Sequence, residues 1–266
     1  MNDKTVLELE DVSIQYGGED FTIRGIGFSI GKGKVFGLSG ESGSGKSSVC
    51  KAVLGLLDER AANVTGTIRF KGKDILSLPY EQRRKINGKD IAVITQNPMT
   101  AFDPCMKIKH HFAKTLSAHL LCSKKDAEFY GGETLGRVGL TDTARIMNSY
   151  PHRLSGGMLQ RVMIAIAISL NPALLVADEP TTALDAESRY TVVQLLQEIV
   201  QKYSPAMLLV SHDMNVMSAL ADDVAVMKAG KIVEAGAAKE VFQNPRHDYT
   251  KELLDARSFM QGGRPC

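Results

Sequence analysis

Residues 40–47 read Gly-Glu-Ser-Gly-Ser-Gly-Lys-Ser, which fits the phosphate-binding pattern G-x-x-x-x-G-K-[ST]. The preceding residues, Val35 to Leu38, form an apolar run of strand length. The apolar residues that follow recur at the spacing of one helix face, at Val49, Ala52, Val53 and Leu56. A strand, a glycine-rich loop and a helix in this order predict an α/β fold that binds a phosphate at the helix N-terminus.

Residues 40–47 are called the phosphate loop below. Both its backbone and its side chains are expected to bind phosphate or the accompanying metal ion. Glycines let backbone N–H groups point at phosphate oxygens. Lys46 is expected to reach the β- and γ-phosphates, and the Ser47 hydroxyl to supply an oxygen ligand to Mg²⁺. Ser48 remains the alternative ligand. The predicted nucleotide-binding residues here are Gly40, Ser42, Gly43, Gly45, Lys46, Ser47 and Ser48.

Composition excludes several classes of function. The 266 residues are 44% hydrophobic, which is typical of a globular chain able to bury a core. The net charge of +2 is too small to favour nucleic acid as the main partner. The N-terminus lacks the pattern of a secretory signal, and the four cysteines lack C-x-x-C spacing, so a reduced, cytosolic protein is expected. The longest apolar stretch, around Met163 to Leu170, is far below the roughly 20 residues that span a bilayer.

The hydrophobic pattern predicts two kinds of sheet. Alternation of apolar and polar residues predicts an antiparallel lobe, from Leu7, Leu9, Val12, Ile14, Tyr16, Phe21, Ile23, Ile26, Phe28, Ile30, Ile68 and Phe70. Continuous apolar runs separated by helical stretches predict a mostly parallel sheet, from residues 35–39, 91–95, 174–177 and 207–211. Residues 224–227 and 232–234 flank a glycine-containing turn and predict a hairpin.

Few strand-forming residues lie between these runs in the middle of the chain. We therefore expect a helical subdomain at about residues 100–170, inserted into a single domain of residues 1–266 with a short C-terminal extension at about 238–266. Helix faces are predicted at Leu159, Val162, Met163 and Ile166, and at Val192, Leu195, Leu196, Ile199 and Tyr203.

Two further motifs contain residues that are expected to take part in catalysis or anion binding. The apolar run from Leu174 ends in Asp178 and Glu179, and successive strand residues point to opposite sides, so the two acids are expected to have different roles. Asp178 is placed to hold Mg²⁺, and Glu179 to accept a proton from the water that attacks the γ-phosphate. Ser155-Gly156-Gly157 precedes a predicted helix and forms a second anion-binding arrangement, with a hydroxyl N-cap and flexible glycines.

With these motifs the chain resembles the ATP-binding cassette family, whose signature is LSGGQ; residues 154–157 match it and Met158 replaces the glutamine. The resemblance implies a P-loop ATPase core with a mostly parallel sheet, an antiparallel β lobe and an inserted helical subdomain. It also implies a head-to-tail dimer in which Ser155 and Gly157 complete the ATP site of the opposing subunit. Met158 is not carried over as a ligand.

The resemblance assigns four further residues. Tyr16 takes the place of the aromatic residue that stacks on adenine, with an ordinary strand tyrosine as the alternative. Gln96 takes the place of the glutamine that contacts Mg²⁺ and the attacking water. Asp185 takes the place of the aspartate that bridges the dimer, and His212 that of the histidine that holds the γ-phosphate. Glu179, His212 and Gln96 are thus the predicted catalytic residues, and Ser47, Gln96 and Asp178 the Mg²⁺ ligands.

Three stretches, 96–104, 154–161 and 244–250, look like the ATP-binding subunits of bacterial nickel and oligopeptide or dipeptide importers, except that Asp248 replaces the usual proline. The 220–227 stretch adds to a preference for the nickel type, with peptide import as the alternative. This resemblance implies ATP and Mg²⁺ as cofactors, and a peripheral place at the cytoplasmic face of the cell membrane. The implied partners are a related but different cassette subunit, two permease subunits and an extracytoplasmic substrate-binding protein.

Other interpretations are kept as alternatives. A cassette ATPase acting on DNA or ribosomes shares the same motifs, but usually has long heptad segments or a second cassette. His110, His111 and His119 lack a complementary ligand set, so a solvated helix face is expected there. A solvated face is also expected for Arg83-Arg84-Lys85, with contact to acidic head groups as the alternative. Cys266 alone cannot build the iron–sulfur cluster that some peptide-importer relatives carry, so no cluster is expected.

Overall fold

The computed structural model describes residues 5–17, 22–58, 60–120 and 122–261. Phe21 and Cys266, which the sequence analysis used, lie outside these ranges. The chain divides into two compact units, a first unit of Met1–Leu78 with Ala206–Cys266 and a second unit of Pro79–Pro205. The boundaries predicted for a single domain, a helical subdomain and a C-terminal extension stay predictions.

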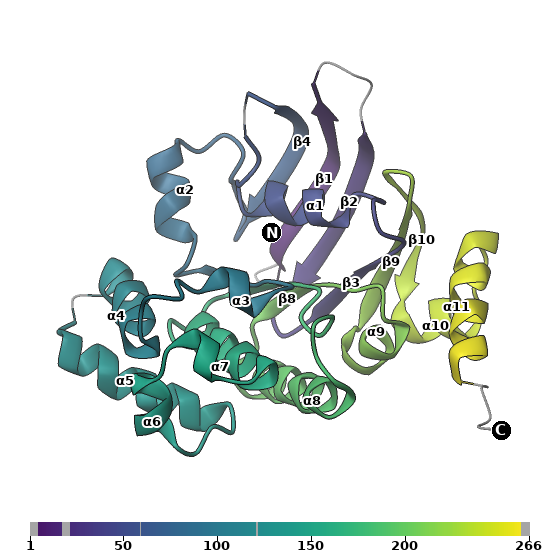
Figure 1. The fold of residues 1–266 in the computed structure, drawn as a ribbon. Coiled ribbons are helices and arrows are strands. Elements are labelled where there is room, and N and C mark those ends of the chain that lie inside the picture. The colour runs from purple at the N-terminus through teal and green to yellow at the C-terminus, as the bar shows by residue number, and fades with distance from the viewer. Residues whose placement is uncertain (1–4, 18–21, 59, 121, 262–266) are drawn as a thin grey trace. The chain divides into compact units, whose positions relative to one another are not determined.

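The first unit contains the predicted antiparallel lobe (Figure 1). Its strand order is β2-β1-β4-β5, with β1 at Thr5–Tyr16, β2 at Ile23–Gly31, β4 at Ala62–Phe70 and β5 at Lys73–Asp74. Leu7, Leu9 and Ile14 on β1 are buried, as the alternation of apolar residues predicts.

A second group of strands in the first unit surrounds β3 (Val35–Ser39). This strand pairs in parallel with β8 (Ala206–Val210) on one side and with β9 (Asp223–Lys228) on the other. All residues of β3 and β8 are buried, which is why both are continuous apolar runs. Strand β10 (Lys231–Ala237) pairs antiparallel with β9, which confirms the predicted hairpin.

Helix α1 (Lys46–Val53) is shorter than the sequence pattern indicates. The predicted apolar face extends to Leu56, but the helix ends at Val53, and Leu56 is 63% exposed. The reason is local: Gly55 has a φ of 62°, a left-handed conformation that commonly stops a helix. The first unit also contains α9 (Met214–Leu220), α10 (Ala238–Gln243) and α11 (Asp248–Gln261).

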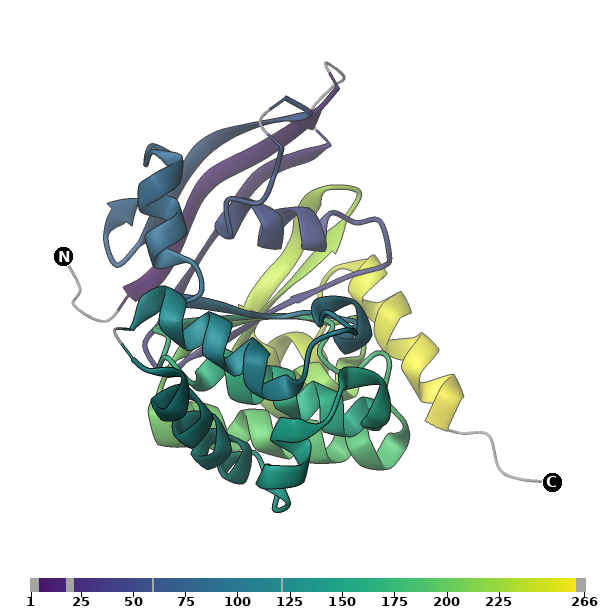
Figure 2. The same cartoon turned by 60° about the vertical axis from the view of Figure 1, so that its left-hand side comes forward.

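The second unit combines two parallel strands with most of the helices. Strands β6 (Ile91–Ile94) and β7 (Leu174–Asp178) pair directly. Between them in sequence lie helices, drawn in teal in Figure 2, at α3 (Pro98–Ala101), α4 (Ile108–His119), α5 (Lys124–Arg137), α6 (Thr143–Asn148) and α7 (Gly156–Ile168). Helix α2 (Tyr80–Ile86) precedes β6, and α8 (Ala186–Tyr203) follows β7.

The predicted faces of the two long helices are largely buried. On α7, Leu159, Val162 and Met163 are buried, and on α8, Leu196 and Ile199 are. The elements confirm the predicted α/β class, with parallel strands, an antiparallel lobe and helices between β6 and β7. Within the described ranges, no helix combines the length and the hydropathy that a bilayer-crossing segment needs.

Candidate nucleotide-binding site

The phosphate loop connects β3 to α1 and depends on its glycines. Gly40, Gly43 and Gly45 have φ values of 140°, 82° and 106°, which L side chains rarely adopt. A Cβ atom on Gly40 would also collide with the carbonyl oxygen of Met227. Since α1 begins at Lys46, the loop leads into the positive end of a helix, as an anion-binding loop requires.

Lys46 is buried against the loop that it belongs to. Its Nζ donates hydrogen bonds of 2.7 Å to the carbonyl oxygens of both Gly40 and Glu41. The Ser44 hydroxyl oxygen lies 3.5 Å from the same nitrogen. The carbonyl oxygens of Gly40 and Glu41 therefore hold the ammonium group at the start of the loop. A phosphate oxygen there could replace a carbonyl oxygen as its hydrogen-bond acceptor.

Tyr16 contacts the start of α1. Its hydroxyl donates a hydrogen bond of 2.9 Å to Ser48 Oγ, and the side chain is half-buried. The bond joins β1 to the first turn of α1. The bond engages the Ser48 hydroxyl, and the neighbouring Ser47 is exposed.

His212 and the phosphate loop lie at the same edge of the parallel strands β3 and β8. Leu38 of β3 pairs with Val210 of β8, and both strands end within one residue of this pair. Asp213 then caps α9, since its Oδ1 accepts a 2.8 Å hydrogen bond from Asn215 N. This turn leaves His212 exposed, next to the strand end from which the phosphate loop begins.

The second unit brings Gln96 and the two acids to one edge in the same way. Ile94 of β6 pairs with Ala177 of β7, so Gln96 and Asp178 lie at neighbouring strand ends. One expectation is wrong in detail: Asp178 and Glu179 do not both belong to the alternation of a strand. Strand β7 ends at Asp178, and Glu179 has a φ of 52°, in the left-handed region.

The left-handed conformation directs Glu179 into the protein, where it is 9% exposed, while Asp178 is half-buried. Thr182 Oγ1 donates a 2.7 Å hydrogen bond to Glu179 Oε2. The two acids therefore have different environments, and the cause is the backbone turn rather than strand alternation.

Ser155 caps α7 as its sequence predicts, since its hydroxyl oxygen accepts a 3.2 Å hydrogen bond from Met158 N. Asp185 caps α8 and accepts two 2.9 Å bonds from Ser188, one from its N–H and one from its hydroxyl. These hydrogen bonds hold the pKa of the Asp185 carboxyl below its ordinary value.

The N-termini of α7 and α8 touch at Gly157. A Cβ atom on this glycine would lie 2.8 Å from Ser188 Cβ, closer than real Cβ contacts. The structure thus brings Ser155, Gly157 and Asp185 to neighbouring helix ends, with Ser155 and Asp185 exposed.

Comparison with known proteins identifies this arrangement. The family model described as ABC transporter matches residues 23–182, from β2 through the segment after Glu179. The chain belongs to the ABC transporter family. It is the ATP-binding cassette, an ATPase, of that family, as the resemblance in the sequence predicted.

Relatives of known function match along most of the cassette. The metal-staphylopine import system ATP-binding protein CntD of Staphylococcus aureus (strain Mu50) is 44% identical, over 87% of this chain and 85% of that protein. The dipeptide transport ATP-binding protein DppD of Bacillus subtilis is 41% identical, over 94% and 76%. The solved dimeric cassette MJ0796, in a post-hydrolysis state bound to ADP and Pi, has a TM-score of 0.76 at 25% identity, over 87% and 98%.

Two polar contacts at Glu179 and the segment after it were not predicted from the sequence. Gln160 is 1% exposed, and its Nε2 donates a 2.8 Å hydrogen bond to the Pro180 carbonyl, which ties α7 to the segment after Glu179. Thr182 holds the Glu179 carboxylate. A glutamine on an otherwise apolar helix face and a hydroxyl three residues after the glutamate were the available signals.

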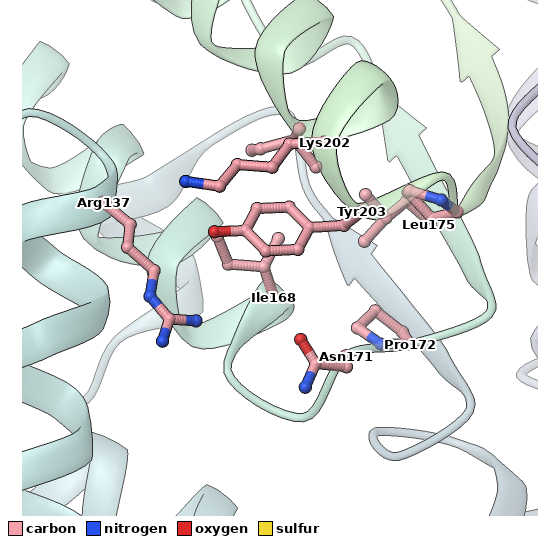
Figure 3. A pocket seen from close by; sticks show the side chains of 9 residues that line it. Arg137, Ile168, Asn171, Pro172, Leu175, Lys202 and Tyr203 are labelled. Atoms are coloured by element: carbon pink, nitrogen blue, oxygen red, sulfur yellow. The ribbon is translucent and has the colours of Figure 1, made fainter.

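A separate cavity of about 430 Å³ in the second unit lies among residues that the site does not use (Figure 3). Arg137, Lys202, Ile168 and Leu175 are among the residues that line it. Both cations lie in the last turns of their helices, α5 and α8, where positive charge offsets the partial negative charge of a helix C-terminus. Their presence is therefore explained without a ligand.

His110, His111 and His119, for which a solvated helix face was expected, all lie on α4. His111 Nε2 lies 3.3 Å from the Asp103 carbonyl oxygen, its ring meets the edge of Phe102, and burial lowers its pKa. In the part of the chain that the structure describes, no group of three or more His, Cys, Asp or Glu side chains is arranged to hold a metal ion.

Proposed function

We propose that this cassette hydrolyses ATP to power uptake of nickel, or of a nickel or other metal chelate, through a membrane permease. The observation that carries the proposal is the 44% identity, over 87% of the chain, to an ATP-binding protein of a metal-staphylopine import system. That system is named for import of metal-staphylopine, so a metal chelate is the substrate class that this relative favours.

Peptide import is the second candidate. Dipeptide and oligopeptide transport ATP-binding proteins of Bacillus subtilis are each 41% identical over 94% of the chain. Since the cassette touches nucleotide rather than cargo in this proposal, its own residues do not separate a chelate from a peptide.

The positions of the site residues support the roles that the family resemblance implies. Lys46 would grip the β- and γ-phosphates while Tyr16 stacks on the adenine. Glu179 would accept a proton from the attacking water, and its Thr182 hydrogen bond would orient the carboxylate. His212 and Gln96 would hold the γ-phosphate and the water, and the phosphate-loop backbone would surround the remaining oxygens.

The chemistry of the donor set fits Mg²⁺. Ser47, Gln96 and Asp178 would contribute a hydroxyl, an amide oxygen and a carboxylate, all of them hard oxygen ligands. When bound, Mg²⁺ would neutralise charge on the β- and γ-phosphates.

Ser155, Gly157 and Asp185 would act across a dimer. They lie at exposed or neighbouring helix ends, which is compatible with contact to the nucleotide of an opposing cassette. The full assembly would contain a related second cassette, two permease subunits and an extracytoplasmic substrate-binding protein. It would place this chain peripherally at the cytoplasmic face of the cell membrane, without a nucleic-acid partner.

Transport into reconstituted vesicles tests the substrate. The assembled complex would be supplied with nickel, with nickel chelates and with short peptides side by side, and ATP-dependent uptake of the metal or its chelate is expected. ATP-dependent uptake of peptides alone would favour the second candidate. Recovery of DNA or ribosomes, and of no membrane protein, in a detergent pull-down of the tagged chain would contradict both.

A further inference from the structure

The segment from Asn244 to Thr250 marked the family resemblance in the sequence, but no function has been assigned to it. It runs from the end of α10 into the first turn of α11, where Tyr249 is 2% exposed. The tyrosine ring belongs to an apolar cluster of the first unit together with Val224, Val226, Ala238 and Val241. A tyrosine buried this deeply needs a partner for its hydroxyl.

That partner is the phosphate loop. The backbone N–H of Glu41, the second residue of the loop, donates a 3.0 Å hydrogen bond to the Tyr249 hydroxyl oxygen. Lys228 Nζ lies 4.3 Å from the centre of the tyrosine ring, close enough for a cation–π contact. The ring is thus held by an apolar cluster and a cation, while its hydroxyl reaches the loop.

The β9–β10 hairpin supports the same stretch of loop backbone. Gly230 N donates a 3.2 Å hydrogen bond to the Ser44 carbonyl oxygen. The Met227 carbonyl lies so close to Gly40 that no side chain fits between them. Three contacts from residues after 220 therefore fix the backbone of Gly40, Glu41 and Ser44.

The turn that presents Tyr249 is itself well connected. The Glu234 carboxylate accepts hydrogen bonds from Arg246 N, at 2.8 Å, and from His247 N, at 3.1 Å. The Tyr249 N–H donates to His247 Nδ1 at 3.1 Å. Hydrogen bonds from three backbone N–H groups therefore fix the turn that positions the Tyr249 hydroxyl.

We propose that Tyr249 is a positioning residue that prepares the phosphate loop for the triphosphate. By holding the Glu41 N–H, it keeps the start of the loop ordered before nucleotide arrives, and binding then costs less conformational entropy. Lys46, which donates to the Glu41 carbonyl, is positioned on the same residue. The inference rests on the proposed binding of ATP by this loop.

The test compares Tyr249→Phe with the wild type in the full-length chain. The variant removes only the hydroxyl and keeps the ring against Lys228. The dissociation constant for MgATP, measured well below the unfolding temperature, is expected to rise about 3- to 10-fold. Tyr203→Phe is the matched control, because Tyr203 also has a lysine, Lys202, over its ring but lies outside the loop; its affinity is expected to be unchanged.

The outcomes separate this inference from the proposed function. A lower unfolding temperature with unchanged MgATP affinity would give Tyr249 a structural role only and overturn the inference, as would no change in either. A wild-type chain that binds no MgATP would instead defeat the proposed function. Hydrogen exchange of nucleotide-free wild type adds a check that needs no variant: the Glu41 amide is expected to be protected, and unprotected exchange would also overturn the inference.

Discussion

Glu179 carries the strongest local signal of function in the cassette. A glutamate with a φ of 52° is strained by roughly 1–3 kcal/mol relative to an ordinary backbone, and it persists only where its surroundings hold it. Here the surroundings are a buried side chain and the Thr182 hydroxyl. Glu179 follows the last residue of β7, and its left-handed backbone gives the carboxylate an environment different from that of Asp178.

Replacing Glu179 by Gln tests its role as the general base. The amide keeps an oxygen that can accept the Thr182 hydrogen bond but cannot take a proton. We expect MgATP affinity to stay near the wild-type value and phosphate release to fall about 10²- to 10⁴-fold. Phosphate release by the assembled complex is the measurement. Glu187→Gln, on an exposed residue of the first turn of α8, is the control, and near-normal turnover of the Glu179 variant would remove Glu179 from this role.

Much at this scale was readable from the sequence. The phosphate loop and Ser155 as an N-cap both follow from local patterns whose partners are nearby in the chain. The Tyr249 contact to Glu41 was not readable, because it joins residues 208 positions apart and one of its groups is a backbone N–H. The turn at Glu179 was missed because a non-glycine residue with positive φ leaves little trace in sequence.

At the scale of elements, the contact between α7 and α8 explains the second glycine of the signature. Gly157 lies where the two helix N-termini meet, against Ser188, which also bonds to Asp185. The glycine is required here by close approach of the helices rather than by a special backbone angle, since its φ is not in the left-handed region.

Gly157→Ala should therefore separate the two helix ends. Overpacking of this kind costs about 1–3 kcal/mol of unfolding free energy. Gly136→Ala, in α5, adds a methyl group with nothing within 4 Å and should be neutral or stabilising by about 0.5–1 kcal/mol. Denaturant unfolding of both variants is the measurement, and equal stabilities would show that α7 and α8 can separate without cost.

We expect the stability that the Asp185 cap gives to the start of α8 to depend on pH. The hydrogen bonds from Ser188 keep its pKa below the ordinary 3.8, so its stabilising contribution is present above that value. The contribution is lost as the pH falls through the lower pKa of the folded state. Asp185→Ala should therefore lower the unfolding temperature at pH 7, and the difference from wild type should shrink below about pH 3.8.

Thermal unfolding followed by circular dichroism from pH 7 to acid measures this difference. Asp185→Asn is the informative control, because the amide oxygen can still accept from the Ser188 N–H while the charge is gone. A deficit of Asp185→Ala that stays constant into acid would mean that the carboxylate charge contributes nothing to capping.

Element boundaries show where sequence reasoning loses accuracy. Strands β3, β6, β7 and β8 each lie within two residues of their predicted limits, because buried parallel strands are continuous apolar runs. Helix α1 was predicted too long, since periodicity continues to Leu56 after Gly55 has already turned the backbone. Local conformation overrode the hydrophobic pattern at that position.

At the scale of the whole molecule, the account depends on two cassettes sharing nucleotide. Within each unit, the predicted residues gather at one edge of parallel strands: the phosphate loop with His212 in the first, and Gln96 with Asp178 in the second. Ser155 and Asp185 are exposed at helix ends. A single sequence predicts such surfaces through family resemblance, because the opposing surface belongs to another chain.

The most direct test is a nucleotide-bound structure of the assembled importer, carrying Glu179→Gln so that MgATP is not consumed. The account predicts one triphosphate held between two cassettes, with Lys46 of this chain at its β- and γ-phosphates and with Ser155 of this chain at the triphosphate of the opposing site. A closed complex with MgATP bound, in which Ser155 lies far from every triphosphate, would contradict it.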